Sequence, residues 1–389
     1  MKNTYVIALA AVVLVIVIGG VFAYTYLGRS AASTPTPKLA AATLNGAGST
    51  LVYPLMSVWE SVYAGVEPQI KVNYNPVGSG TGITDFQDQI VDFGGSDAPM
   101  TAAQYAALPS GTTALTIPIS ASAVVPAYNL KLANGSICGN GLNFTGTVLA
   151  NIFLGTITTW NDTQIQSLNP TIPLPDTPIT TVHRSDGSGT MFAFTDFLSE
   201  ASPTWNKTAG KSTSATIWPT IPLEIAAPKN AGVAAAIAGN NGAIGPLEIA
   251  YILENTGQTS LYYGTVQNAA GNFILANVTN IAAALQAGAS FGLPAGNAAW
   301  TSVSMVDNVY GDAAATNIYP IVTLTYALVY EQQSSYTQGA ALVNFTSWIV
   351  NSGQTDGQGL GYVALPANIV AVDNATIKLI TYDGTPIQS

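Results

Sequence analysis

Apolar and polar positions alternate between helical and strand periods along the first part of the folded chain, with glycine-rich segments between them. Residues 53–63 place apolar side chains at helical spacing and predict an amphipathic helix, whereas residues 70–74 alternate like a strand. The glycine-rich segment 78–82 precedes a second predicted helix that reaches about Ile90, and residues 91–97 predict a short strand running into a loop. This order of elements indicates an α/β fold with open sheets, in which ligands bind at the carboxyl ends of the strands.

An uncharged apolar run occupies residues 5–27 and is long enough to span a bilayer as a helix, which takes about 20 residues. It predicts a signal anchor in residues 1–29, with a cleaved secretory signal peptide as the alternative. Residues 30–43 are rich in Ser, Thr, Pro and Ala and predict a linker between the membrane and the folded body. The protein is therefore expected at the cell surface, outside the cytoplasm, or secreted if the N-terminal segment is cleaved.

The composition excludes several classes of protein. Hydrophobic residues make up 48% of the chain and charged residues 8%, which rules out a disordered protein. The 10 Lys and Arg face 20 Asp and Glu, so no nucleic acid is expected as a partner. Cys138 and His183 are the only residues of their types, which excludes a disulfide framework and zinc sites built from several cysteines or histidines. No cofactor or metal is expected.

Sequons for N-glycosylation occur seven times after the apolar run, which favours an exported, glycosylated surface. Together with the sparse charge and the predicted membrane span, they suggest an archaeal-type cell surface. The sequons begin at Asn134, Asn143, Asn161, Asn206, Asn277, Asn344 and Asn374.

Four loops rich in glycine and small hydroxyl residues predict a site for a small oxyanion. They lie at residues 46–50, 78–81, 94–97 and 184–190. Free N–H groups at helix N-termini attract anions, and glycine lets an anion approach the backbone closely. For any one loop, ordinary turn and N-cap chemistry is the alternative.

Arg184 is the only arginine of the folded body and lies in the loop richest in glycine and hydroxyl groups. Arginine grips oxyanions with two parallel hydrogen bonds. The alternative partner for Arg184 is Asp186 or a neighbouring acid, and both roles are compatible, because an aspartate behind the arginine fixes its orientation.

The two most specific motifs of the chain are VDFGGSDAP at residues 91–99 and RSDGSGT at residues 184–190. Other motifs are GAGST, GSGTG, IFLGTITTW, GAIG and YPI. In this order along the chain, these segments resemble motifs of the periplasmic-type phosphate-binding proteins of ATP-driven phosphate importers, and the match covers residues 44 to about 370.

The resemblance implies a two-lobed α/β periplasmic-binding-protein fold, type II-like, with the ligand in a cleft between lobes joined by two crossing strands. Lobe one would comprise residues 44–120 and 322–389, and lobe two residues 121–321. The resemblance further implies binding of inorganic phosphate without catalysis, and delivery to the permease subunits of an ABC importer.

The family's ligand residues carry over to individual positions of this chain. Thr50 would donate its hydroxyl and N–H, and Leu51 only its N–H, where the family usually has phenylalanine. Gly80 replaces the second serine of the family's loop, so that Ser79 alone would donate there. The full predicted ligand set is Thr50, Leu51, Ser79, Asp97, Arg184, Ser188, Gly189 and Thr190, with Asp186 holding Arg184.

Asp97 would set the specificity of this site. A carboxylate that faces an anion is useful only if the anion carries a proton to donate, as phosphate does at neutral pH and sulfate does not. An acceptor that faces another acceptor in a dry site is costly, so Asp97 would reject sulfate. The alternative for Asp97 is a helix N-cap after a strand.

Two other functions fit the sequence less well, namely a phosphate-ester hydrolase and a glycosylated structural protein of the cell surface. Ser79 and Ser188 lack the flanking glycines of a hydrolase nucleophile turn. Lys211 and Ser212 resemble the end of a nucleotide-binding loop, but Trp205 stands where its first glycine is needed. His183 beside Arg184 is interpreted as a flanking strand residue.

Overall fold

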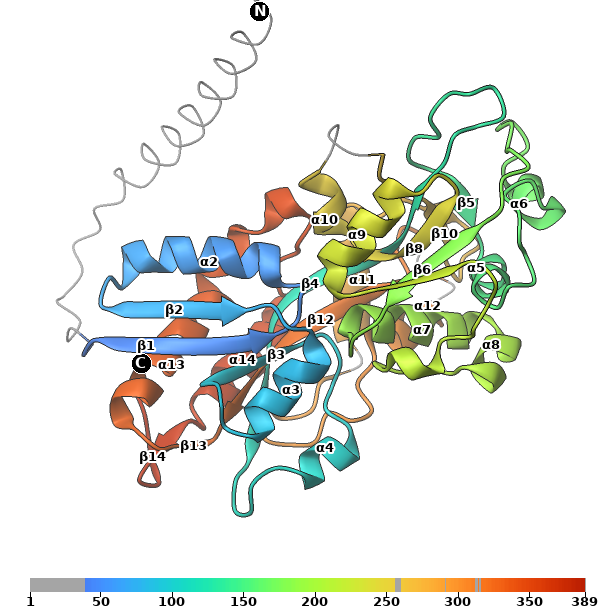
Figure 1. Ribbon diagram of the computed structural model, residues 1–389. Helices are drawn as coiled ribbons and strands as arrows, with labels where there is room; N and C mark the ends of the chain where they lie inside the picture. Colours follow the sequence, from blue (N-terminus) through green and yellow to red (C-terminus); the bar gives the residue numbers. More distant parts are fainter. Residues whose placement is uncertain (1–38, 256–259, 291, 312–313, 315, 389) are drawn as a thin grey trace, which may run out of the picture. The chain divides into compact units, whose positions relative to one another are not determined.

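The long strand β4 (Ala114–Asn129) joins two groups of strands into one sheet. The computed structural model describes residues 39–255, 260–290, 292–311, 314 and 316–388 (Figure 1). Up to Ala123, β4 pairs antiparallel with β12 (Val322–Tyr330), and from Val124 it pairs antiparallel with β8 (Ala243–Glu248). All 16 residues of β4 are buried, as expected for a central strand covered on both faces.

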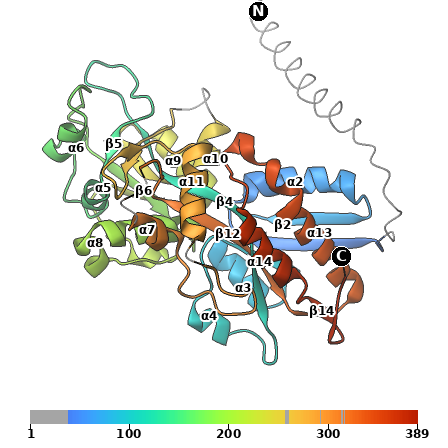
Figure 2. The same ribbon diagram turned by 180° about the vertical axis from the view of Figure 1, so that it is seen from behind.

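The first group of strands is mostly parallel and belongs to the first lobe. The order across it is β2-β1-β3-β12, with β12 antiparallel to β3. Helix α3 packs on β1 and β3, whereas α13 and α14, seen from behind in Figure 2, pack on β1 and β4. The bounds are β1 Ala42–Gly48, β2 Ile70–Asn75, β3 Phe93–Ser96, α2 Tyr53–Val66, α3 Ser79–Gln87, α4 Ala102–Ala106, α13 Tyr336–Asn351 and α14 Ala367–Ile377.

The second group, β8-β6-β7, is parallel and belongs to the second lobe. Helix α9 packs on all three of these strands, and α7 packs on β8. The bounds are β6 Thr180–Arg184, β7 Glu224–Ala227, α5 Gly146–Phe153, α6 Thr163–Leu168, α7 Gly189–Ala201, α8 Pro203–Thr208, α9 Lys229–Gly239, α10 Ile249–Leu253, α11 Val278–Ala289 and α12 Met305–Tyr310.

Short strands complete the fold. Strand β9 (Tyr262–Tyr263) pairs with β4, and two three-stranded sheets have the orders β11-β10-β5 and β13-β14-β15. Their strands are β5 Asn143–Phe144, β10 Thr265–Gln267, β11 Phe273–Ile274, β13 Gln332–Gln333, β14 Thr381–Tyr382 and β15 Thr385–Pro386.

A β-bulge interrupts the central ladder between β4 and β12. Thr325 pairs with Ser120, but the next residue, Tyr326, pairs with Pro118, so Ile119 is left as the extra residue. Proline has no N–H to donate, and within sheets it is tolerated at bulges. Bulges change the direction of side chains. This bulge lies beside Asp97, the first residue after β3.

The structure agrees with the elements expected near the first loops. The helix expected at residues 53–63 is α2, and the strand expected at residues 70–74 is β2. Helix α3 stops at Gln87, short of Ile90, because Gln89 has a φ of 58° in the left-handed region. Strand β1 begins at Ala42, so the last two residues of the expected linker belong to this strand.

The two-lobed α/β fold is confirmed, whereas the expected lobe bounds remain a prediction. No helix within the described ranges is both long and apolar enough to cross a membrane. The expected span at residues 5–27 lies outside those ranges.

Candidate oxyanion site

Loops that follow strands of both lobes meet at one place. Ser49 and Thr50 follow β1, Asp97 follows β3, and the loop from Ser185 to Ser188 follows β6. The Gly80 N–H donates to the Gly187 carbonyl at 3.1 Å, and the Gly189 N–H donates to Ser79 Oγ at 3.2 Å. The structure therefore brings the predicted loops of the two lobes into direct contact.

The predicted site residues are withdrawn from solvent. Arg184 and Ser79 are each 1% exposed, and Asp97 is 2% exposed. In so dry a site, electrostatic interactions are stronger than in water and unpaired polar groups are costly. The other buried members of the predicted set are Thr50, Leu51, Ser188, Gly189 and Thr190.

Glycine is required where the two lobes touch. A Cβ at Gly189 would lie 2.5 Å from the Asp97 Cβ, and a Cβ at Gly80 would lie 3.0 Å from the Gly187 Cα. Real Cβ atoms do not approach other atoms at 2.5 Å, so position 189 admits only glycine. Position 80, where the family has a second serine, lies so close to the Gly187 backbone that a side chain would crowd it, and glycine avoids this crowding.

The Asp97 carboxylate is held by three hydroxyl groups. Ser49 Oγ lies 2.6 Å from both of its oxygens, Thr325 Oγ1 donates to Oδ1 at 2.7 Å, and Ser79 Oγ donates to Oδ2 at 3.2 Å. Burial raises the pKa of Asp97 above its ordinary value. The hydroxyl donors and the Arg184 charge act in the opposite direction and offset part of this shift. The N-cap alternative is wrong, because the N-cap of the next helix, α4, is Thr101.

Arg184 is oriented by an acidic partner, as one of the two sequence readings anticipated. Its Nε donates to Asp186 Oδ1 at 2.7 Å, and its Nη2 donates to Asp186 Oδ2. Asp186 also accepts the Lys229 N–H at 2.9 Å. Burial alone would raise the pKa of Asp186, but the Arg184 guanidinium holds it below its usual value. The pair fixes Arg184 without using all of its donors.

Residues that the sequence did not single out also contact the predicted set. Asn230, the second residue of α9, donates its N–H to Thr50 Oγ1 at 3.4 Å, and its side chain bridges Arg184 to Thr190. Tyr251 Oη donates to the Thr50 carbonyl at 2.7 Å. Ser49 and Thr325 contact the Asp97 carboxylate. Of these residues, only Ser49 had a sequence signal, because it lies inside a glycine-rich loop.

Local turn and cap bonds involve two residues of the predicted ligand set. The Leu51 N–H donates to Ser49 Oγ at 3.0 Å. Ser188 is the N-cap of α7, and its Oγ accepts the Met191 N–H at 3.3 Å. The ligand roles of Leu51 and Ser188, like those of the rest of the set, remain predictions.

His183 lies outside this cluster of polar groups. Its ring stacks on Trp218 with centroids 5.0 Å apart, and its Nδ1 lies 3.0 Å from the Arg184 carbonyl. Burial lowers the pKa of His183. The interpretation of His183 as a strand residue is confirmed, since it belongs to β6.

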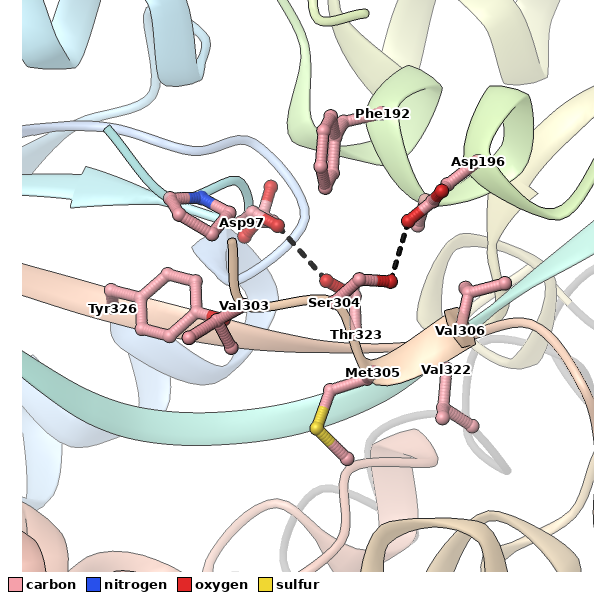
Figure 3. A pocket seen from close by; sticks show the side chains of 12 residues that line it. Asp97, Phe192, Asp196, Val303, Ser304, Met305, Val306, Val322, Thr323 and Tyr326 are labelled. Carbon is pink, nitrogen blue, oxygen red and sulfur yellow. Dashed lines mark hydrogen bonds between the residues drawn. The ribbon is translucent and has the colours of Figure 1, made fainter. Parts of the chain in front are cut away.

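A narrow cavity lies beside Asp97, with Asp196 among its other lining residues (Figure 3). Thr323 Oγ1 donates to the Asp97 carbonyl at 2.9 Å, and Ser304 Oγ donates to Asp196 at 2.6 Å. The cavity measures about 10 Å³, which is room for one water molecule and not for a tetrahedral oxyanion. Burial raises the pKa of Asp196 to about 6, and Lys211 pairs with it at 2.9 Å.

Comparison with known proteins identifies the family of the chain. The sequence pattern of the PBP superfamily domain matches residues 33–352. The phosphate-binding protein PstS of Xylella fastidiosa is 36% identical, with 87% of each chain covered. PstS of Methanocaldococcus jannaschii is 31% identical over 86% of this chain and 85% of its own.

Solved structures are similar to this chain in fold. A crystal structure of a phosphate-binding protein from Stenotrophomonas maltophilia has a TM-score of 0.66 at 20% identity, covering 86% of this chain and 94% of that one. The chain belongs to the PBP superfamily and, within it, to the family of the PstS phosphate-binding proteins.

Proposed function

We propose that this protein binds inorganic phosphate outside the cytoplasm and delivers it to the permease subunits of an ABC importer. It is a transport component and not an enzyme. The relatives named as PstS phosphate-binding proteins support this function. The observation that carries it is the meeting of the two predicted halves of the site: Ser79 Oγ donates to the buried Asp97 carboxylate and accepts the N–H of Gly189, in the loop of the buried Arg184.

The chemistry of this pair selects a protonated oxyanion. Arg184 would donate to the anion with the guanidinium nitrogens that Asp186 leaves available, while Asp97 would accept the proton that the anion carries. The ligand set that we propose is Thr50, Leu51, Ser79, Asp97, Arg184, Ser188, Gly189 and Thr190. Titration calorimetry with phosphate tests the proposal, and an absence of phosphate binding by the purified protein would refute it.

The first prediction concerns specificity. We expect wild-type protein to bind phosphate far more tightly than sulfate, and Asp97→Asn to narrow this difference, because the amide can donate to sulfate. Calorimetry with both anions measures the ratio. Asp196→Asn is the matched control, since Asp196 lies beside the same cavity and should leave the ratio unchanged. Wild-type protein that binds both anions equally would refute the role of Asp97.

The second prediction concerns ionic strength. The folded body after residue 43 carries seven Lys and Arg and 20 Asp and Glu, a net charge of −13, so it repels phosphate at long range. Affinity must then arise from short contacts in the dry site, which salt screens little. We expect phosphate affinity to stay constant or rise as inert salt is added at neutral pH. A steep loss would indicate a surface ion-exchange site instead.

We further propose that residues 1–29 anchor the protein in the membrane and that the surface is glycosylated, as on an archaeal cell. Four of the seven sequon asparagines are exposed, which supports their use as acceptors. The mass of the protein purified from its natural source measures both features. An unmodified polypeptide mass would refute glycosylation, and a mass lacking the N-terminal segment would refute the anchor. The exposed asparagines are Asn134, Asn161, Asn206 and Asn277.

A further inference from the structure

Strand β12 aims a hydroxyl group at Asp97. Ser96, the last residue of β3, pairs antiparallel with Tyr326, and the same register places Asp97 opposite Thr325. Thr325 is fully buried, and its Oγ1 donates to Asp97 Oδ1 at 2.7 Å. The β-bulge that begins after Thr325 fixes this side chain at the point where β12 leaves β3.

The hydroxyl of Thr325 serves the carboxylate alone among the described residues. By contrast, Ser49 Oγ also accepts the N–H groups of Leu51 and Val52, and Ser79 Oγ accepts those of Asp97 and Gly189. Removal of either serine hydroxyl would therefore disturb a loop as well as the carboxylate. Of the three donors, Thr325 is therefore the one whose hydroxyl can be removed with the least disturbance of other hydrogen bonds.

We propose, building on the phosphate-binding function, that Thr325 is a specificity-determining positioning residue that keeps Asp97 an acceptor and thereby excludes fully deprotonated oxyanions. A protonated Asp97 could donate its own proton to sulfate. A charged hydrogen bond from Thr325 stabilises the ionised carboxylate and makes that protonation costly. Phosphate, which brings its own proton, needs no such change.

Other charged and titratable groups surround Asp97 and bear on its protonation. Arg184 on β6 favours the ionised form, whereas the fully buried Glu248 on β8, when ionised, would oppose it. Burial raises the pKa of the neighbouring tyrosines, which keeps them neutral near pH 7. These tyrosines are Tyr74, Tyr326 and Tyr362. None of these groups is itself changed in the Thr325 variants, so a comparison of variants with the wild-type protein reports on Thr325.

The test is Thr325→Val, which replaces the hydroxyl by a methyl group of similar size. We expect the preference for phosphate over sulfate, measured by calorimetry at pH 7, to fall at least tenfold. Sulfate binding takes up one proton, so it should strengthen as the pH falls, and in the variant this rise should begin about one pH unit higher.

The matched control is Thr323→Val. Thr323 lies two residues away on the same face of β12, but its hydroxyl donates to the Asp97 carbonyl and not to the carboxylate. We expect wild-type preference and an unshifted pH profile. Thr325→Ser, which restores a hydroxyl, should recover the wild-type preference. If Thr325→Val does not fold, Thr325→Ala is measured in the same way.

The outcomes separate this inference from the function on which it rests. Wild-type protein that binds no phosphate would refute the proposed function. A Thr325 variant that binds phosphate with the wild-type preference would refute only the role of Thr325. A variant that binds both anions more weakly by the same factor, with no shift of the sulfate pH profile, would show that Thr325 is merely structural and would also overturn the inference.

Discussion

Replacement of Arg184 by alanine is expected to weaken phosphate binding by tenfold or more, beyond the effect of any single serine or threonine change. Hydrogen bonds to charged groups are worth about 1.5–3 kcal/mol, against about 1 kcal/mol for neutral ones. Arg184 is the only arginine among residues 39–388, and it is almost fully buried, so no other guanidinium can take its place. Calorimetry of Arg184→Ala beside Thr190→Val measures the difference.

Loss of the guanidinium also strips Asp186 of its charged partner, which is a second cost. The double variant Arg184→Ala with Asp186→Asn removes that unpaired charge and reports the loss of anion contacts alone. Arg184→Lys keeps the charge but not the planar fork, so its affinity should lie between the wild-type and alanine values. Unchanged affinity in Arg184→Ala would exclude this residue from the site.

A second large effect, on the stability of the fold, is expected from replacement of Asp373. This residue lies on α14, remote in sequence from the predicted ligand residues. Its side chain is fully buried, and neither carboxylate oxygen has a hydrogen-bond partner among the described residues. Burial raises the pKa of Asp373 to about 9. The folded protein therefore holds a proton there that the unfolded chain releases, so stability falls as the pH rises from about 4 towards 9.

Asp373→Asn removes this linkage. At pH 7 the wild-type protein bears a cost of about 4 kcal/mol for keeping the carboxyl group protonated, and the variant does not. We expect the variant to be more stable by an amount of that order at pH 7, with a difference that shrinks towards pH 4. Urea denaturation at both pH values measures it.

Asp176→Asn, which removes one carboxyl group from an exposed loop, is the control. A stability difference for Asp373→Asn that is equal at pH 4 and pH 7 would show that Asp373 is not protonated in the folded state.

Local pattern was sufficient to predict elements next to the site and one ion pair within it. Helix α2 and strand β2 follow from apolar spacing, and the pair of Arg184 with Asp186 follows from a separation of two residues in one loop. These predictions succeed because their determinants lie within a few residues of one another.

The supporting groups could not be predicted because they come from distant parts of the chain. Thr325 reaches Asp97 across 228 residues, and Tyr251 reaches Thr50 across 201. Their positions depend on which strands become neighbours and on a bulge that shifts the register by one residue. Pro118 inside an apolar strand was the only local sign of that bulge.

The contact between the two lobes has a kinetic consequence. At Gly80 and Gly187 the lobes meet backbone to backbone, where the Gly80 N–H donates to the Gly187 carbonyl at 3.1 Å. Such an edge has no side chain that could rotate aside, so a trapped anion escapes only when the lobes separate. The residence time of the ligand is then set by lobe opening, and anions of different affinity that are held in the same closed form should leave at similar rates.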